Sequence, residues 1–225
     1  MTILDIRALR GLLLTLIVMG AMLFLAAGTL RYWQAWVFLA LFGALALAMT
    51  LYLIKYDPEL LARRLRGGPT AEKESSQKII MWLVSIGFGA ILVVSGLDHR
   101  FGWSAAPASV AIAGNAIVAL GWAIIFFVFR ENSFSSATIE IAPDQKVISS
   151  GPYALVRHPM YAGGLLYFLG MPAALGSWWG LLAALLTTPP LIWRIFEEEK
   201  FLGEKLPGYP DYRDKVKYRL APFIW

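Results

Sequence analysis

Residues 11–30 of the 225-residue chain, GLLLTLIVMGAMLFLAAGTL, carry no charge and lie between Arg10 and Arg31. A helix of about 20 apolar residues is needed to cross the roughly 30 Å hydrocarbon core of a bilayer. Such a helix satisfies its backbone hydrogen bonds internally, because lipid offers no partners for them. This stretch therefore predicts a membrane-spanning helix.

Three further charge-free stretches have a similar length, at residues 32–54, 79–97 and 101–129. The whole chain is 58% hydrophobic and 16% charged, against about 25% charged residues in an average soluble domain. So few charges cannot cover the surface of a soluble protein, and so much apolar content excludes disorder. The composition predicts an all-α, multi-pass membrane protein.

The fifth charge-free stretch, residues 159–193, is too long for one span. As a single helix it would be about 52 Å long, well beyond the membrane thickness. Turn-forming residues lie near its middle, beside two potential interfacial anchors: Gly170, Pro172, Gly176, Ser177, Trp178 and Trp179. We therefore predict a C-terminal helical hairpin and a bundle of about six spans.

The distribution of basic residues predicts the orientation of this bundle. Of the 20 Lys and Arg residues, all except Arg31 and Arg100 fall on one predicted side. By the positive-inside rule that side is cytoplasmic, with both termini there, in what we expect to be a prokaryotic cytoplasmic membrane. Basic loops facing anionic lipid account for the net charge of +5, so no nucleic-acid partner is predicted.

The first apolar stretch also has the small residues Ala26, Ala27 and Gly28 near its end, which a cleaved signal peptide would need. The apolar core of a signal peptide is usually 7 to 15 residues long, so the greater length favours a span. The chain contains no cysteine, which excludes disulfides, thiolate metal sites and a catalytic cysteine.

Two polar segments have an open interpretation. Residues 138–141 and 147–149 flank Ala142, Pro143 and Asp144, which indicates either a short β-hairpin or an ordered cytoplasmic loop. The segment 55–78 contains a run of arginines followed by Gly67-Gly68-Pro69. We interpret it as a segment that binds lipid headgroups or as a lid.

A first candidate site surrounds Arg157 and His158, immediately before the fifth stretch. Pro159 suits the first turn of a helix, because its missing amide hydrogen would be unbonded there anyway. The preceding residues then stand at a helix N-terminus, where an anionic group is favoured. The alternative is that Arg157 is a membrane anchor and His158 a helix cap.

A second candidate site follows the fifth stretch, at Arg194 and residues 197–199, which are three consecutive glutamates. Arg194 and Glu198 are four apart and share one helix face, so they could form an ordinary surface ion pair. An ionisable residue at membrane depth is costly, however, and is by default a functional candidate. A third block, around Tyr209 and Tyr212, could equally be an amphipathic tail lying along the headgroups.

Together these blocks resemble the isoprenylcysteine carboxyl methyltransferase family and its relatives among membrane phospholipid methyltransferases. The matching residues are Gly151-Pro152-Tyr153, Arg157-His158-Pro159-Met160-Tyr161, Gly163, Arg194, Glu198-Glu199, Leu202, Tyr209, Tyr212, Val216 and Pro222, with Asn132 and Phe134 upstream. The resemblance covers about the last 95 residues. It divides the chain into an N-terminal transmembrane region, residues 1–130 with four spans, and a C-terminal methyltransferase region, residues 131–225. The chain departs from the family at Gln145, where some members have His, and at an apparent insertion over residues 205–208.

The resemblance implies an enzyme that uses S-adenosylmethionine, bound in a pocket on the cytoplasmic side. The cofactor contacts that it implies are Gln145, Lys146, Val147, Ile148, Tyr153, His158, Pro159, Met160, Tyr161, Glu198 and Glu199. Arg194 and Glu198 are the implied catalytic residues, with Arg194 binding the acceptor, a carboxylate on a prenylated or otherwise lipophilic molecule in the bilayer. No metal is implied.

Methyl transfer from a sulfonium is an in-line displacement, so the protein mainly has to align the two reactants and exclude water. A carboxylate acceptor needs no general base, and a guanidinium can orient it with two parallel hydrogen bonds. The alternatives are a phospholipid N-methyltransferase, whose protonated amine has no use for a guanidinium, a membrane reductase that uses NADPH, and a non-catalytic transporter or scaffold.

Overall fold

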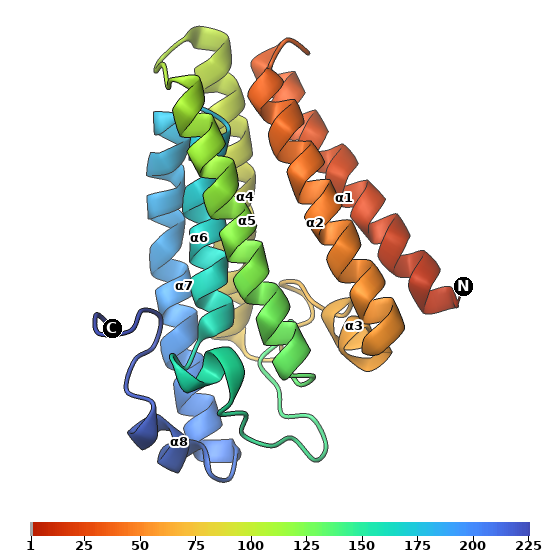
Figure 1. Ribbon diagram of the computed structural model, residues 1–225, viewed down its shortest axis with the longest axis vertical. Helices are drawn as coiled ribbons and strands as arrows, with labels where there is room; N and C mark the ends of the chain where they lie inside the picture. The colour runs from red at the N-terminus through yellow and green to blue at the C-terminus, as the bar shows by residue number, and fades with distance from the viewer. Residues whose placement is uncertain (1) are drawn as a thin grey trace.

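The computed structural model describes residues 2–225, which form a bundle of long helices (Figure 1). The elements are α1 (Ile3–Ala27), α2 (Trp33–Tyr56), α3 (Pro58–Arg64), α4 (Ser75–Phe101), α5 (Ala108–Glu131), a 3-10 turn η1 (Gly151–Ala154), α6 (Pro159–Ala174), α7 (Trp178–Lys205) and α8 (Tyr209–Lys215). The described residues contain no strand. The predicted all-α class is therefore confirmed.

Five helices are long and apolar enough to cross a membrane: α1, α2, α4, α5 and α7. The sixth predicted crossing, α6, has only 16 residues, so a count of six spans stays a prediction. The predicted reversal between α6 and α7 is present, because α6 ends at Ala174 and α7 begins at Trp178. Ser177 caps α7 there, its hydroxyl oxygen accepting from the backbone N–H of Gly180 at 2.8 Å.

The end of the bundle with this reversal is tied together by a buried carboxylate. Asp98 of α4 accepts hydrogen bonds from the hydroxyls of Ser104 at 2.6 Å and Ser177 at 2.5 Å. Tyr32, which precedes α2, donates its hydroxyl to the carbonyl oxygen of Leu175 at 2.6 Å. Arg100 lies beside Gly28 at the same end. Arg31, in the connection from α1 to α2, and Arg100, near the end of α4, are therefore in segments at the end of the bundle opposite to α3 and α8 (Figure 1).

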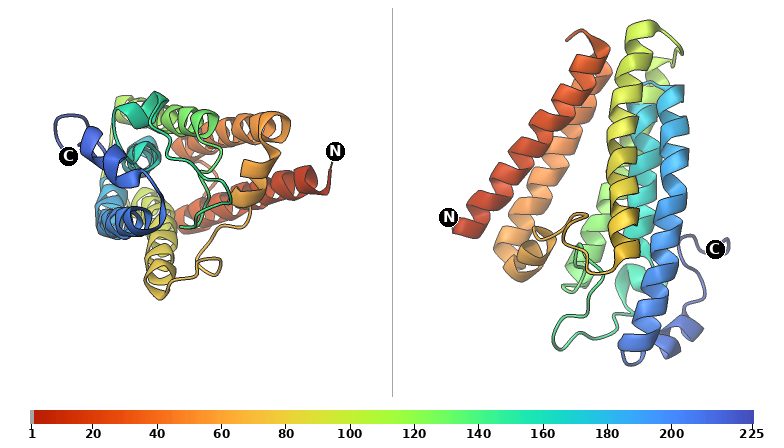
Figure 2. Two further views of the ribbon diagram at one scale, coloured as in Figure 1. Left: turned by 90° about the horizontal axis from the view of Figure 1, so that it is seen from below. Right: turned by 180° about the vertical axis from the view of Figure 1, so that it is seen from behind.

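Helices α5 and α6 contact each other through their backbones. A Cβ atom added to Gly114 would lie 2.1 Å from the backbone nitrogen of Ala174, and one added to Gly121 would lie 2.5 Å from the carbonyl oxygen of Gly163. Small residues of this kind let helices approach closely in lipid, where packing contacts must supply the association energy. By contrast, the α1–α2 pair diverges from α4 towards the end that carries α3 (Figure 2), where α2 still packs against α5 through residues such as Leu53 and Phe129.

The stretch 138–149 is an ordered loop, so the alternative of a β-hairpin is wrong. Pro143 has no amide hydrogen to give to a ladder, and Asp144 adopts a left-handed conformation with φ 59°. The backbone N–H of Ala142 instead donates to Oε1 of Gln145 at 2.9 Å. The loop crosses the same end of the bundle as α3 and α8 (Figures 1 and 2).

Candidate functional site

A pocket lies at the α8 end of the bundle, between the loop that follows α5, the first turn of α6, the end of α7 and α8. Its cavity volume is about 100 Å³. Ten of the eleven predicted cofactor contacts line it: Gln145, Lys146, Val147, Ile148, Tyr153, His158, Pro159, Met160, Tyr161 and Glu198. Segments far apart in the sequence thus meet at one pocket.

Tyr153 joins three of these segments. Its hydroxyl oxygen accepts from Nδ2 of Asn132 at 2.9 Å and lies 3.1 Å from the hydroxyl of Ser135. Its carbonyl oxygen accepts from the hydroxyl of Tyr212 at 2.8 Å, which connects η1 to α8. Burial raises the pKa of Tyr153, so the phenol stays protonated at neutral pH.

Glu199, the eleventh predicted contact, does not line the pocket. Its carboxylate is buried and accepts from Nε of Arg157 at 2.7 Å and from Nε of Arg219 at 2.9 Å, with Nε2 of His158 at 3.2 Å. His158 stands at the N-cap position of α6, but its side chain makes no capping hydrogen bond. Glu199 therefore organises the turn that carries the pocket residues.

The same turn holds the C-terminal tail. Nη1 of Arg157 donates to the carbonyl oxygens of Val216 and Lys217, each at 2.8 Å. The backbone N–H of His158 donates to the carbonyl oxygen of Arg219 at 2.9 Å. Arg157 is therefore a buried ion-pair and tail-binding residue, and the prediction that it is a membrane anchor is wrong.

Arg194 and Glu198 are connected through a tyrosine. The hydroxyl of Tyr161 donates to Oε2 of Glu198 at 2.6 Å, and Nε of Arg194 donates to the same hydroxyl at 3.0 Å. Within residues 2–225, Arg194 and Glu198 form no direct ion pair. The structure brings both predicted catalytic residues to Tyr161 at the wall of the pocket.

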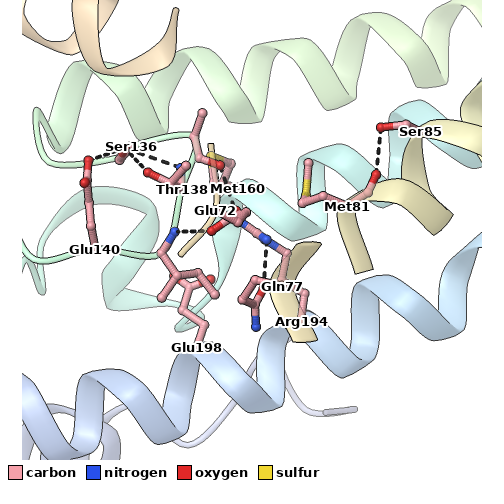
Figure 3. Close-up of polar contacts among 12 residues, drawn as sticks. Glu72, Gln77, Met81, Ser85, Ser136, Thr138, Glu140, Met160, Arg194 and Glu198 are labelled. Carbon is pink, nitrogen blue, oxygen red and sulfur yellow. Dashed lines mark hydrogen bonds and ion pairs between the residues drawn. The ribbon is translucent and has the colours of Figure 1, made fainter. Parts of the chain in front are cut away.

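The guanidinium of Arg194 has protein partners on all three nitrogens, and Figure 3 shows Glu72 and Gln77 beside it. Nη2 donates to Oε1 of Glu72 at 2.7 Å and Nη1 to Oε1 of Gln77 at 2.8 Å. Arg194 is 5% exposed and Glu72 4% exposed. A buried cation is costly unless paired, so Glu72 stabilises Arg194 at this depth.

Sequence reasoning missed Glu72 and Gln77. Glu72 lies 122 positions before Arg194, in the segment that we interpret as a headgroup-binding region or a lid. Its charge does not distinguish it from the neighbouring Glu74. Only the folded chain identifies it as the partner of Arg194.

The sequence model of the phospholipid methyltransferase family matches residues 109–207. This region runs from α5 through α7 and includes most of the pocket wall. No curated protein matches the chain. The match, together with five apolar helices long enough to span, indicates an integral membrane methyltransferase.

Proposed function

We propose that the protein transfers a methyl group from S-adenosylmethionine to a carboxylate oxygen of a lipophilic acceptor. The observation that carries the proposal is the convergence of three separate sequence blocks on one pocket, with Arg194 and Glu198 meeting at its wall through Tyr161. Together with the family match over residues 109–207, it supports membrane-embedded methyl transfer.

The pocket residues fit such a cofactor. The hydroxyl of Tyr209 is buried and has no hydrogen-bond partner among the described residues, and Tyr209 lines the pocket. An unpaired buried hydroxyl is costly, so a polar ligand group beside it would be stabilised. Burial raises the pKa of Tyr209, so its hydroxyl would act as a donor. Tyr153 and Tyr212 add aromatic surface, and Glu198 adds a carboxylate for a hydroxyl or amino group of the cofactor.

When bound, the cofactor supplies a methyl group on a positively charged sulfur. The residues of the chain then bind and align. Glu198 holds a polar group of the cofactor while Tyr161 fixes the carboxylate of Glu198, and Arg194 fixes the hydroxyl of Tyr161. Leu202 and Leu206 also line the pocket and help to exclude water from it. Alignment and exclusion of water are the main requirements of an in-line displacement.

A carboxylate acceptor suits this wall because it needs no base to ionise it. The contact between Glu72 and Arg194 at 2.7 Å supports the view that a carboxylate can be accommodated beside this guanidinium. An acceptor that used Arg194 directly would have to displace Glu72.

A phospholipid amine is the second candidate acceptor. Two observations favour it: the name of the matched family and the neutralisation of Arg194 by Glu72. An ammonium group would be attracted to carboxylates such as Glu140 and Glu198, which both line the pocket. It would also have to lose a proton before it could attack.

The test uses the full-length protein in lipid nanodiscs with methyl-labelled cofactor and two acceptors, N-acetyl-S-farnesylcysteine and phosphatidylethanolamine. We expect label in a base-labile ester of the first. Label only in phosphatidylethanolamine would overturn the carboxylate acceptor, and no product with either, together with no thermal stabilisation by S-adenosylhomocysteine, would overturn the enzyme.

Glu198→Gln is the sharpest variant, because the amide keeps the size of the side chain and removes its charge. We expect methyl transfer to fall at least 100-fold while the protein stays folded. Arg194→Ala should also abolish transfer, but it leaves Glu72 buried without its cation. A fully active Glu198→Gln variant would contradict the assigned role.

A further inference from the structure

Arg64, the last residue of α3, is a half-buried guanidinium without a carboxylate partner. Across residues 2–225, no acidic oxygen lies within 4 Å of it, whereas Arg63, Arg157 and Arg194 each pair with a glutamate. Burial and, to a lesser extent, the nearby charge of Arg194 lower the pKa of Arg64 to about 10. The side chain is therefore a cation at neutral pH whose charge lacks compensation.

The hydrogen bonds of Arg64 occupy only one of its nitrogens. Nη1 donates to the carbonyl oxygen of Ser136 at 3.1 Å and to Sδ of Met160 at 3.6 Å. The guanidinium carbon lies 4.9 Å from the centre of the Phe129 ring. The N–H bonds of Nε and Nη2 point the same way along one edge of the guanidinium, so this free edge remains able to bind a carboxylate with two parallel hydrogen bonds.

Arg64 stands between two hollows. Its partners Ser136 and Met160 line the pocket proposed for the cofactor. Arg64 and Phe129 also line an open groove among α1, α2, α3 and α5, which has a volume of about 350 Å³. A molecule lying in the groove with its head at Arg64 would therefore reach the wall of the pocket.

Arg64 is the only charged residue among the described residues that line the groove. Its walls include Leu12, Phe42, Leu53 and Leu61. The two threonines that line it, Thr15 and Thr50, donate their hydroxyls to backbone carbonyls of their own helices. An apolar chain thus meets no unpaired hydroxyl along its length.

A glycine keeps the groove open. Gly11 of α1 lines it, and a Cβ atom added there would have no neighbour within 4 Å. On the same helix, a Cβ atom added to Gly20 would already contact Leu39 at 3.8 Å. At Gly11 the surface of α1 therefore leaves space in the groove, whereas at Gly20 α1 already packs closely against Leu39 of α2.

We propose that this groove binds the apolar chain of the methyl acceptor and that Arg64 binds the acceptor's carboxylate head beside Tyr161. The inference rests on the proposed function. The apolar side chains that α1 and α2 expose, such as Leu13, Leu14 and Leu51, would face lipid, which would supply an acceptor chain without passage through water. The unpaired cation at the inner end selects an anionic head, and Arg194 is already neutralised by Glu72. Arg64 is then the acceptor-binding residue of the reaction.

The experiment measures acceptor and cofactor separately for Arg64→Gln and Arg64→Lys in nanodiscs. We expect Arg64→Gln to raise the KM for N-acetyl-S-farnesylcysteine at least tenfold, with Arg64→Lys between it and the native protein. Thermal stabilisation by S-adenosylhomocysteine should be unchanged. A wild-type KM in a folded Arg64→Gln variant would overturn the proposal, as would an equal loss of cofactor binding, which is what a purely structural arginine predicts.

Gly11→Leu tests the groove without touching Arg64. The leucine fills the space in the groove, so we expect the KM to rise more for the farnesyl acceptor than for a geranyl analogue, while the stability stays unchanged. Gly20→Leu on the same helix is the matched control and should leave both values unchanged. Equal kinetics for the two leucine variants would remove the groove from the acceptor path.

Direct binding of a fluorescent farnesylcysteine carboxylate to the nanodiscs separates this inference from the proposed function. Binding that is lost in Arg64→Gln supports the site even if no methyl is transferred, in which case only the proposed function fails. Binding equal in both proteins overturns the site. Competition by phosphatidic acid, without competition by a lipophilic carboxylate, would overturn the carboxylate head in favour of a phosphate.

Discussion

The contact between α5 and α6 and the space between α1 and α5 use glycine in opposite ways. At Gly114 and Gly121 the absence of a side chain brings two backbones together, because added Cβ atoms would lie 2.1 Å and 2.5 Å from backbone atoms of α6. At Gly11 the same absence leaves a hollow in the wall of an open groove. The α5–α6 contact is closely packed and supports the pocket, whereas the groove beside α1 has room for an apolar ligand.

The two regions also treat buried cations differently. Arg157 and Arg194, on the pocket side, are held by Glu199 and Glu72 at 2.7 Å. Arg64, on the groove side, has no such partner among the described residues. Paired cations stabilise one arrangement of the chain, whereas an unpaired one is available to a ligand.

Breaking the ion pairs on the pocket side should have the largest effect. Glu199→Gln leaves Arg157 and Arg219 without a counter-charge, and removing one partner of a buried pair costs about 3–5 kcal/mol. We expect a lower thermal midpoint and a C-terminal tail that is cleaved by added protease. Glu204→Gln, an exposed carboxylate on the same helix, is the control. Equal midpoints for the two variants would contradict the assigned role.

The glycine comparison predicts opposite signs for one substitution at two places. Gly114→Ala forces a methyl group against the backbone of α6 and should cost about 1–3 kcal/mol or more. Gly11→Ala meets no neighbour and should be neutral or should stabilise the helix by up to about 1 kcal/mol. Thermal unfolding of both variants in the same detergent checks the difference. Destabilisation by Gly11→Ala of the same size would show that α1 is as closely packed as α5.

Two tyrosines at the pocket extend the comparison to hydroxyl groups, because one has a hydrogen-bond partner in the protein and the other has none among the described residues. Tyr209→Phe removes a hydroxyl that has no partner within residues 2–225, so the stability should be unchanged. The affinity for the cofactor should fall about three- to tenfold, because one hydrogen bond contributes about 1 kcal/mol. Tyr212→Phe removes the hydrogen bond to the carbonyl oxygen of Tyr153 and should lower stability by about 1 kcal/mol. Calorimetric titration with S-adenosylhomocysteine and thermal unfolding give the two values. Unchanged affinity in Tyr209→Phe would exclude its hydroxyl as a ligand.

The smallest effect is expected at the surface of α3. Nη1 of Arg63 lies 3.8 Å from Oε2 of Glu59, whose side chain is 85% exposed. Exposed pairs of this kind contribute little, so Glu59→Gln should change stability by less than about 0.5 kcal/mol. Unfolding at low and high salt checks this, and a larger, salt-sensitive change would show that the pair of Glu59 and Arg63 stabilises α3 more than an exposed ion pair does.

Much of the bundle could be predicted from local sequence. Charge-free stretches of sufficient length predicted α1, α2, α4 and α5, and the Gly176-Ser177 region predicted the reversal before α7. These features depend on composition within about 20 residues, which the membrane as solvent makes decisive. The loop 138–149 was ambiguous because alternating apolar residues suit a strand or an irregular segment equally well.

The candidate site could be predicted only in part. Resemblance to a family identified ten residues that line the pocket, because they lie in short blocks with recognisable spacing. It did not identify the partners of Arg194, and it assigned Glu199 to the cofactor although its carboxylate binds Arg157, His158 and Arg219. Neighbouring glutamates on one helix point in different directions, and spacing alone does not say which cation each one meets.

By itself, the sequence determined that this protein is an all-helical chain with apolar helices long enough to span a membrane, and which polar blocks lie at their ends. Those properties follow from hydrophobicity and helix geometry, which act locally. Only the tertiary structure decided that Glu72 neutralises Arg194, that Glu199 holds the turn before α6, and that Arg64 remains without a carboxylate between a pocket and an apolar groove. Pairing of buried charges depends on which side chains the packed helices bring within hydrogen-bond distance, and residues more than a hundred positions apart meet only in the folded chain.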